Sequence, residues 1–332
     1  MGKYKVVNTD VSLHPVRKED VEKLGMVDAE LTGTDCKKED DVIFLAKDAD
    51  AIVFAQAPIT KRVINALEKC KVIVRYGSGM DNIDTKTATE KGIMVSYVPE
   101  FCIEEVSNHA FMLLLACSRR LKVLDRLLSD KGEWSYVFGY IGGIQGETLG
   151  LIGFGKIAKT LARKAKCFGM NIITYDPYVC AEIFKETGVT SVSLEELLKK
   201  SDYISLHAPL TDETEHLIGE KELELMKKTA VIINTARGKL IDEEALINTL
   251  RKKRISGVGL DVFEKEPPEP GNALLHMDNV IVTPHCASYS IESYNKLRTA
   301  VIDEVVRVFR GKLPKNLYNS FHRSGVAKKM EF

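Results

Sequence analysis

One stretch decides the fold of this chain, and it reads Gly146-Glu147-Thr148-Leu149-Gly150-Leu151-Ile152-Gly153-Phe154-Gly155-Lys156-Ile157-Ala158. An apolar strand leads into two glycines, and the spacing of the apolar residues that follow predicts a helix. A second apolar strand is expected at Asn171–Tyr175, and it ends at Asp176. A strand, a glycine turn, a helix and an acidic second strand end are the context in which a G-x-G-x-x-G/A pattern binds a dinucleotide.

Each residue of this pattern has a physical task. Gly153 permits the tight turn, Gly155 lets the backbone approach a pyrophosphate, and Ala158 allows close packing of helix and strand. The free N–H groups at the start of the helix attract phosphate. A glycine triplet alone also occurs in purely structural turns, but the surrounding pattern favours a nucleotide site. Asp176 is placed to bind the ribose hydroxyls and would repel a 2′-phosphate, which favours NAD over NADP as the cofactor.

Length, charge and cysteine content limit the classes of protein and partner that are expected. A chain of 332 residues predicts two domains, and 47 basic against 47 acidic side chains, without charged blocks, exclude nucleic acid and membrane surfaces as expected partners. The seven cysteines are scattered and lack a C-x-x-C pair or metal-ligand spacing, so we expect reduced thiols, no metal and a cytoplasmic protein. We find no signal peptide and no apolar run long enough to span a bilayer.

Short apolar strands alternate with amphipathic helices, which predicts an α/β fold with parallel sheets covered on both faces. Strands are expected at Tyr4–Asn8, Ala51–Ala55, Val72–Tyr76 and Ile93–Tyr97, and then at Leu149–Ile152, Asn171–Tyr175, Tyr203–His207, Val231–Asn234, Gly257–Val262 and Val280–Thr283. Helices outside the fingerprint are expected at Arg17–Leu24, Asp40–Ala46, Lys61–Lys69, Thr85–Lys91, Ile103–Leu128 and Ile291–Arg310. The later six strands would make a complete doubly wound sheet.

Polar residues follow several of these later strands, where ligands bind in open α/β sheets. Reduction of a 2-oxo acid by hydride needs a cation for the carboxylate and ketone, and the planar fork of Arg237 suits this task. It also needs a proton donor, and His285 suits that. Glu264 or Glu266 would orient the imidazole. Each residue alone is as easily a surface ion pair or strand cap, whereas their joint placement beside a nucleotide fingerprint favours a catalytic site.

The motifs together resemble the NAD-dependent D-isomer-specific 2-hydroxyacid dehydrogenases over nearly the whole chain. The similar segments are Arg75–Asp84, Gly150–Ala158, Ser205–Thr211, Asn234–Gly238, Leu260–Phe263 with Glu266-Pro267, and Thr283–His285. Within the family, the chain looks most like the branch of the C-terminal-binding-protein dehydrogenase domains. The resemblance implies an NAD-binding Rossmann domain, residues 101–291, inserted into a flavodoxin-like substrate domain made of residues 1–100 and 292–332.

The resemblance also implies individual roles. Arg237 would bind and polarise the substrate, His285 would be the acid/base, and Glu266 rather than Glu264 would be its partner. Ser78 and Gly79 would hold the substrate carboxylate through backbone N–H groups, and Phe101 would give the pocket an apolar wall. The residues implied to bind the cofactor are Gly153, Gly155, Lys156, Ile157, Asp176, His207, Ala208, Pro209, Thr214, Thr235, Ala236, Arg237, Asp261 and His285. The family usually dimerises, and the helix from Ile103 and the loop with Trp134 are the candidate contacts.

Departures from the family pattern concern the substrate. Asn108 stands where many members have Glu before His109, and Ser288 replaces the Trp common in the nearest branch. The stretch Phe54–Ala57 lacks the Arg of phosphoglycerate-specific members, which favours a non-phosphorylated 2-oxo acid. Two alternatives stay open: a D-3-phosphoglycerate dehydrogenase, and an interaction protein that senses NAD(H). Glu266 rather than Gln argues against a formate dehydrogenase.

Overall fold

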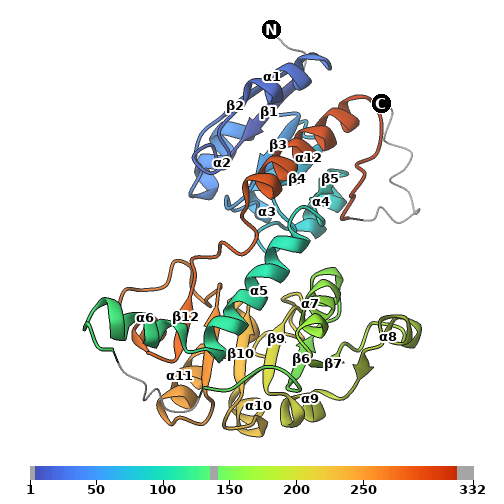
Figure 1. Cartoon of the computed structure of the whole chain (residues 1–332). Helices are drawn as coiled ribbons and strands as arrows, with labels where there is room; N and C mark the ends of the chain where they lie inside the picture. Colours follow the sequence, from blue (N-terminus) through green and yellow to red (C-terminus); the bar gives the residue numbers. More distant parts are fainter. Residues whose placement is uncertain (1–3, 135–140, 320–332) are drawn as a thin grey trace. The chain divides into compact units, whose positions relative to one another are not determined.

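The computed structural model describes residues 4–134 and 141–319, and Figure 1 traces them in chain order. The chain divides into two compact units. The first unit takes residues from both ends of the chain, 1–101 and 290–332, and the second is the continuous segment 102–289. Within the described ranges, no helix is both long enough and apolar enough to cross a lipid bilayer.

A five-stranded parallel sheet with the order β2-β1-β3-β4-β5 forms the centre of the first unit. Its strands are β1 (Tyr4–Asn8), β2 (Ala29–Gly33), β3 (Ala51–Phe54), β4 (Val72–Arg75) and β5 (Met94–Ser96). Its helices are α1 (Lys18–Gly25), α2 (Glu39–Ala46), α3 (Lys61–Ala66), α4 (Thr85–Glu90) and α12 (Ile291–Phe309). This strand order is that of flavodoxin-like sheets, so the predicted fold of this unit is confirmed.

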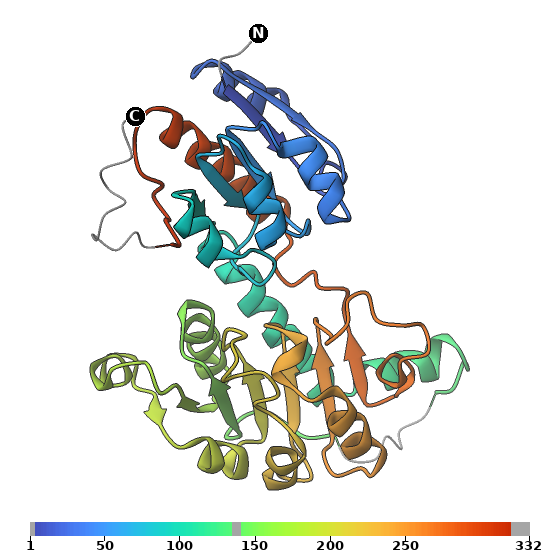
Figure 2. The same cartoon turned by 180° about the vertical axis from the view of Figure 1, so that it is seen from behind.

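Helix α12 comes from the far end of the sequence and completes the first unit (Figure 2). It buries Leu297, Val301 and Val305 and packs against α1 and β4. After the helix, the side chain of Asn319 accepts a hydrogen bond from the backbone N–H of Val95 in β5 at 2.8 Å. Residues 291–319 are therefore part of the core and edge of this unit.

Strand β2 was not predicted from the sequence. It lies at the edge of the sheet and pairs only with β1. Only Ala29 among its five residues is buried, because this strand has a neighbour on one side and is mostly exposed on its faces. An edge strand of this kind lacks the apolar run that identifies a central parallel strand.

The second unit is built on a seven-stranded parallel sheet with the order β12-β11-β10-β9-β6-β7-β8. Its strands are β6 (Thr148–Ile152), β7 (Asn171–Tyr175), β8 (Thr190–Ser191), β9 (Tyr203–Leu206), β10 (Val231–Asn234), β11 (Gly257–Leu260) and β12 (Val280–Val282). The order reverses between β6 and β9, as it does at the switch point of a Rossmann sheet. The predicted Rossmann fold is confirmed, with β8 as a seventh, two-residue edge strand that the sequence pattern did not reveal.

Helices cover both faces of this second sheet and enclose two separate apolar cores. Helices α5 (Ile103–Ser118) and α7 (Lys156–Cys167) pack against each other and bury residues such as Leu113, Leu114 and Leu161 on one face. Helices α9 (Leu194–Lys200), α10 (Glu220–Leu225) and α11 (Glu243–Arg251) enclose the other core. Helix α8 (Ala181–Thr187) contacts the edge strand β8.

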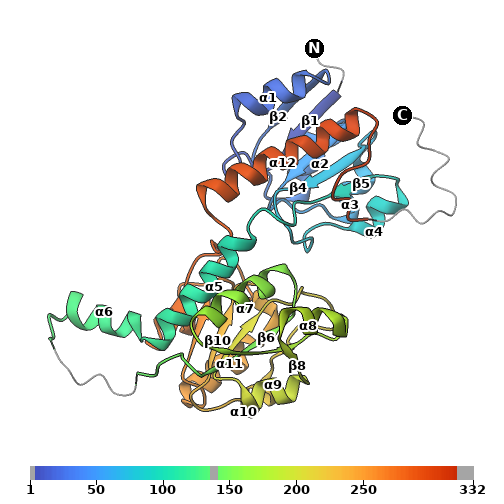
Figure 3. The same ribbon diagram turned by 45° about the vertical axis from the view of Figure 1, so that its right-hand side comes forward.

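The helix predicted from Ile103 to Leu128 is in fact two helices. Helix α5 ends at Ser118, and α6 (Leu121–Ser129) begins after Arg120, whose φ of 53° lies in the left-handed region. A residue with this backbone conformation interrupts the ladder of helical hydrogen bonds, so the direction of the chain changes. Figure 3 shows α6 leaving the body of the second unit, and none of its residues is buried.

Candidate active site

His285 and Glu266 form a close pair at the carboxyl-terminal edge of the second sheet. His285 follows β12, Glu266 lies in the loop after β11, and His285 Nδ1 lies 2.6 Å from Glu266 Oε2. The other carboxylate oxygen, Oε1, accepts a hydrogen bond from the backbone N–H of Phe263 at 3.0 Å. The His285 side chain is 50% exposed, and its Nε2 makes no hydrogen bond to the described part of the chain. One ring nitrogen is thus fixed by a carboxylate while the other is available to a ligand.

The charge of Glu266 is maintained by its surroundings. Burial of this carboxyl group raises its pKa. The hydrogen bonds from His285 and the Phe263 amide lower it, as do the charges of His285 and Arg237, and these lowering effects outweigh burial. The net result is a pKa below the ordinary glutamate value, so Glu266 is anionic near neutral pH. An anionic partner on Nδ1 orients the imidazole.

Glu264, the other carboxylate that the sequence offered, has different partners. Its Oε1 accepts a hydrogen bond from the backbone N–H of Glu243 at 2.9 Å and lies 2.8 Å from His216 Nε2. These contacts tie the loop after β11 to the start of α11. The structure therefore pairs Glu266, and not Glu264, with His285.

Arg237 is presented by the turn that follows β10. The buried side chain of Asn234 donates a hydrogen bond to the Arg237 carbonyl at 2.8 Å and accepts one from the Ala236 N–H at 3.0 Å. The next residue, Gly238, lies so close to the loop after β11 that an added Cβ would be 1.9 Å from the Phe263 carbonyl carbon. This close approach brings Arg237 near enough to Glu266 for its charge to lower the carboxyl pKa.

Asp261 holds the turn on which His285 stands. Its side chain is buried and accepts hydrogen bonds from the backbone N–H groups of Cys286 and Ala287, each at 2.9 Å. It also accepts one from the Thr283 hydroxyl at 2.5 Å. The His285 N–H donates to the Asp261 carbonyl oxygen at 2.8 Å. Main chain and side chain of one aspartate thus fix the segment from residue 283 to residue 287.

The fingerprint turn lies at the switch point of the same sheet edge. Gly153 has a φ of 86°, and an added Cβ would lie 2.7 Å from the Ala208 nitrogen in the segment after β9. Gly155, by contrast, has ordinary backbone geometry, and an added Cβ would meet no atom within 4 Å. Packing within the protein requires the first glycine but not the second. The open space at Gly155 adjoins the N-terminus of α7, which fits a bound pyrophosphate.

Two further side chains fit NAD. Asp176 accepts hydrogen bonds from the backbone N–H groups of Phe154 and Tyr178 at 2.8 and 2.9 Å, so the fingerprint turn fixes the position of its carboxylate. A carboxylate has about four acceptor positions, which leaves capacity for the ribose hydroxyls. The hydroxyl of Thr235 is buried without a hydrogen-bond partner in the described ranges. A buried polar group of this kind needs a partner, and a cofactor amide or hydroxyl would satisfy it.

The contrast between the two glycines gives a prediction with an internal control. Gly153→Ala is expected to lower the free energy of unfolding by about 2 kcal/mol or more, because it adds strain and a backbone clash. Gly155→Ala is expected to leave the stability nearly unchanged but to weaken NADH binding. Denaturant unfolding and NADH fluorescence titration measure the two effects. Equal stability loss in both variants would contradict this assignment.

The remaining residues expected at the cofactor lie after β9 or at the start of α7. Ala208 and Pro209 lie next to the fingerprint turn, and Lys156 and Ile157 begin α7. Burial lowers the pKa of His207 to about 4, so this side chain is neutral near pH 7. The Thr214 hydroxyl donates within its own loop, to the Pro209 carbonyl oxygen at 2.6 Å.

The chain is similar to known proteins in both sequence and fold. The profile described as "D-isomer specific 2-hydroxyacid dehydrogenase, NAD binding domain" matches residues 111–287. The chain belongs to this family. Glyoxylate reductase from Korarchaeum cryptofilum is 42% identical over 285 residues, which are 84% of this chain and 85% of that protein. D-3-phosphoglycerate dehydrogenase from Methanocaldococcus jannaschii is 41% identical over 95% of this chain but only 59% of its own length.

Solved structures agree with this assignment. D-lactate dehydrogenase from Aquifex aeolicus, solved with NAD and lactic acid, superposes with a TM-score of 0.80 at 32% identity. The match covers 92% of this chain and 96% of the Aquifex chain. This 2-hydroxyacid dehydrogenase therefore uses NAD and interconverts a 2-oxo acid with the D-2-hydroxy acid.

Of the residues expected to bind substrate, Arg237 lies in the second unit and the other three lie in the first. Ser78 is exposed and Gly79 half-buried in the loop after β4, whereas Phe101 is buried at 8% exposure. Sequence reasoning did not assign Asn234 and Gly238, which shape the Arg237 turn, or His109, which contacts Thr283. Asn234 could have been selected from the sequence, because it is the one polar residue in the strand Val231–Asn234. The contact of His109 carries no local signal.

Proposed function

We propose that this dehydrogenase acts as an NADH-dependent reductase of small, non-phosphorylated 2-oxo acids. The similarity to glyoxylate reductases, the Asp176 carboxylate and the pairing of His285 with Glu266 support this proposal. We place the reaction in the cytoplasm, in keeping with seven cysteines that are all unpaired.

Three residues of the second unit have separate roles in the proposed reaction. NADH, held by the fingerprint turn at Gly153 and Gly155 and by Asp176, would supply the hydride for C2 of the 2-oxo acid. Arg237 holds the substrate carboxylate and polarises the ketone with its planar pair of N–H groups. His285, protonated on Nε2, gives its proton to the ketone oxygen as C2 accepts the hydride, and the product is the 2-hydroxy acid. Glu266 stabilises the imidazolium before the transfer and keeps Nδ1 protonated afterwards.

The observation that carries this mechanism is the His285–Glu266 pair. A distance of 2.6 Å fixes the imidazole, and the low pKa of Glu266 keeps the proton on the histidine side of the pair. Arg237 contributes to the low pKa, so the three side chains form one electrostatic group. A cation, a proton donor and an anionic partner are the set that ketone reduction requires.

A kinetic panel tests the proposed substrate class. NADH absorbance is followed with glyoxylate, hydroxypyruvate, pyruvate, oxaloacetate and an aromatic 2-oxo acid. We expect turnover of the small acids, with the lowest kcat/KM for the aromatic one. No turnover of any acid by protein that binds NADH would overturn the proposal.

The relative from Methanocaldococcus jannaschii supports a second candidate, a D-3-phosphoglycerate dehydrogenase. The neutral stretch from Phe54 to Ala57, at the end of β3, lacks a cation for a phosphate group. Activity confined to 3-phosphohydroxypyruvate, with none on glyoxylate, would establish this candidate in place of the first. An NAD(H)-sensing role without catalysis would show as NADH binding with no turnover on the whole panel.

We also propose that the dehydrogenase is a homodimer formed through α6. This helix has an apolar side, yet none of its residues is buried. Leu121 and Leu128 are 57% and 52% exposed, and Trp134 beyond the helix is 75% exposed. Large apolar side chains gathered on one exposed helix indicate an interaction surface, and the family resemblance indicates a second copy of this chain as the occupant.

Two substitutions on α6 test the dimer. Leu121→Glu combined with Leu128→Glu is expected to convert the dimer into a monomer, because four charges would face one another across a two-fold interface. Multi-angle light scattering gives the mass directly. Phe44→Glu is the matched control, since Phe44 is 92% exposed on α2 of the first unit. A wild-type monomer, or a double variant that remains dimeric, would contradict the proposal.

A further inference from the structure

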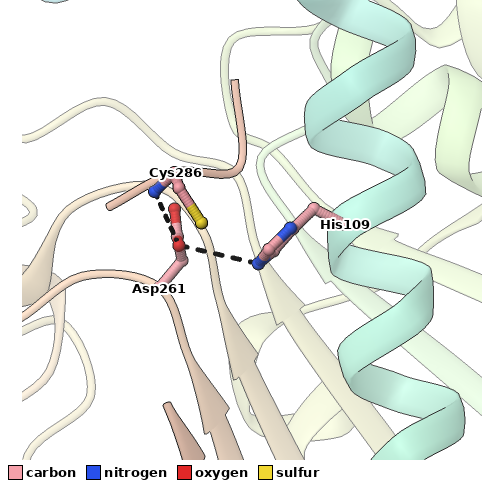
Figure 4. Close-up of side chains that lie close together, drawn as sticks. All are labelled: His109, Asp261 and Cys286. Carbon is pink, nitrogen blue, oxygen red and sulfur yellow. Dashed lines mark hydrogen bonds and ion pairs between the residues drawn. The ribbon is translucent and has the colours of Figure 1, made fainter. Parts of the chain in front are cut away.

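His109 on α5 contacts the two residues that support the catalytic turn, although it lies far from them in the sequence. Its Nε2 is 2.9 Å from the Thr283 hydroxyl and 3.6 Å from Asp261 Oδ1. Figure 4 shows the imidazole pointing from the helix toward Asp261, with Cys286 next to the same carboxylate. The histidine side chain is 15% exposed.

The direction of the hydrogen bonds follows from the proton of Thr283. A hydroxyl has one proton, and that of Thr283 is donated to Asp261 Oδ1 at 2.5 Å. The bond between His109 and Thr283 must therefore be donated by Nε2–H of the imidazole. The result is a directed chain in which His109 donates to Thr283 and Thr283 donates to Asp261. Polarised chains of this kind strengthen their members.

His109, Asp261 and Cys286 are all residue types that can bind a metal ion, but the protons on the histidine and the cysteine oppose metal binding here. The potential ligand atoms of His109, Asp261 and Cys286 all lie within 4.8 Å of one another. A metal ion would need the lone pair of Nε2, which carries the proton donated to Thr283. It would also need a thiolate, whereas burial and then the charge of Asp261 raise the pKa of the Cys286 thiol. The geometry therefore favours a hydrogen-bonded support over a metal site.

This support acts on the residues that bracket His285. Asp261 Oδ1 receives both the Thr283 hydroxyl and the Cys286 N–H, which are on either side of the histidine. His285 itself has a φ of 51°, a left-handed conformation that persists only where the surrounding contacts hold it. The Thr283 hydroxyl accepts a hydrogen bond from His109 while it donates one to Asp261. These two bonds together fix the position of the Thr283 side chain.

We propose that His109 is a positioning residue for proton transfer. It acts through Thr283 and Asp261 to hold His285 at the distance from Glu266 at which reduction is efficient. The charged group that faces His285 is Glu266, which in turn feels the charge of Arg237, and the groups that face His109 are Asp261 and Cys286. The inference rests on the proposed role of His285 as the proton donor.

Two substitutions of His109 separate its N–H group from its bulk. His109→Leu removes the donor, and His109→Gln restores an N–H at the same number of bonds from Cβ. With His109→Leu we expect kcat to fall about ten- to hundredfold, with a small change in the KM for NADH. We also expect the pH profile of kcat to change, because a displaced His285 loses part of its contact with Glu266. His109→Gln is expected to restore most of both properties.

Ser107→Ala is the matched control, because Ser107 is a buried polar residue of α5 that hydrogen-bonds Lys164 on α7 instead. It should leave the pH profile of kcat unchanged. An unchanged profile in His109→Leu, or equal losses in the Leu and Gln variants, would overturn the proposal. His285→Asn separates the two ideas. If His285→Asn abolishes reduction while His109→Leu has no effect, only the positioning role fails, and full activity of His285→Asn would refute the proton donor itself.

Discussion

Replacing His285 with asparagine is expected to lower kcat for 2-oxo acid reduction by about 10²- to 10⁴-fold. The imidazole is the group of this site that can deliver a proton near neutral pH, and its Nδ1 is already held by Glu266 at 2.6 Å. Asparagine is chosen because it tolerates the left-handed backbone at this position. A stopped-flow measurement of NADH oxidation at saturating substrate gives kcat.

NADH affinity and thermal stability serve as controls for this variant. Both should remain close to wild type, since the backbone bonds from residues 285–287 to Asp261 do not involve the imidazole. Glu266→Gln should reduce kcat by a smaller factor, because the amide can still accept a hydrogen bond from Nδ1 but no longer stabilises its positive charge. A His285→Asn enzyme with wild-type kcat would remove the proposed acid from the mechanism.

Replacing Arg237 with alanine is expected to lower kcat/KM by about 10³-fold or more. One guanidinium would bind the carboxylate and polarise the ketone, so its loss affects binding and catalysis together. Arg237→Lys should recover part of the activity, since it restores the charge without the planar fork. Steady-state kinetics with the best acid of the panel measures both.

The same variant should change the pH dependence. The charge of Arg237 is one of the factors that lower the pKa of Glu266, so its removal lets that pKa rise. Because Glu266 must be anionic to support His285, the acid limit of activity is expected to move to higher pH in Arg237→Ala. Lys239→Ala is the control: Lys239 is exposed, lies in the same segment and pairs with Glu215 at 3.1 Å. A comparable loss in Lys239→Ala would mean that the effect is only one of net charge.

Most residues of the candidate site could be predicted from the sequence, because their placement follows from local rules. The carboxyl ends of parallel strands share one edge, so polar residues directly after β10, β11 and β12 had to lie near one another. Arg237, Asp261 and His285 could be selected on this basis. The choice between Glu264 and Glu266 could not be made from residue type, since both lie in one charged loop. It is settled by hydrogen bonds to Glu243 and to His285, respectively.

The features that could not be predicted from the sequence depend mainly on contacts between segments that are far apart in the chain. Thr283 and His109 are 174 positions apart, and nothing in either segment marks the bond between them. The need for glycine at 238 arises from the loop around Phe263, not from its own backbone. Strands β2 and β8 were missed because edge strands expose most of their residues. The break at Arg120 was missed because apolar spacing continues on both sides of it.

The contribution of α12 to the first unit has a consequence for biosynthesis. As the chain leaves the ribosome, residues 102–289 are complete and contiguous and can fold as soon as they emerge. The first hundred residues emerge earlier, yet they must wait for Leu297, Val301 and Val305 to cover their apolar face. Throughout translation of the middle segment, β4 is left without this helix. The part of the protein made first is therefore finished last, and during that interval it is the part exposed to chaperones and to aggregation.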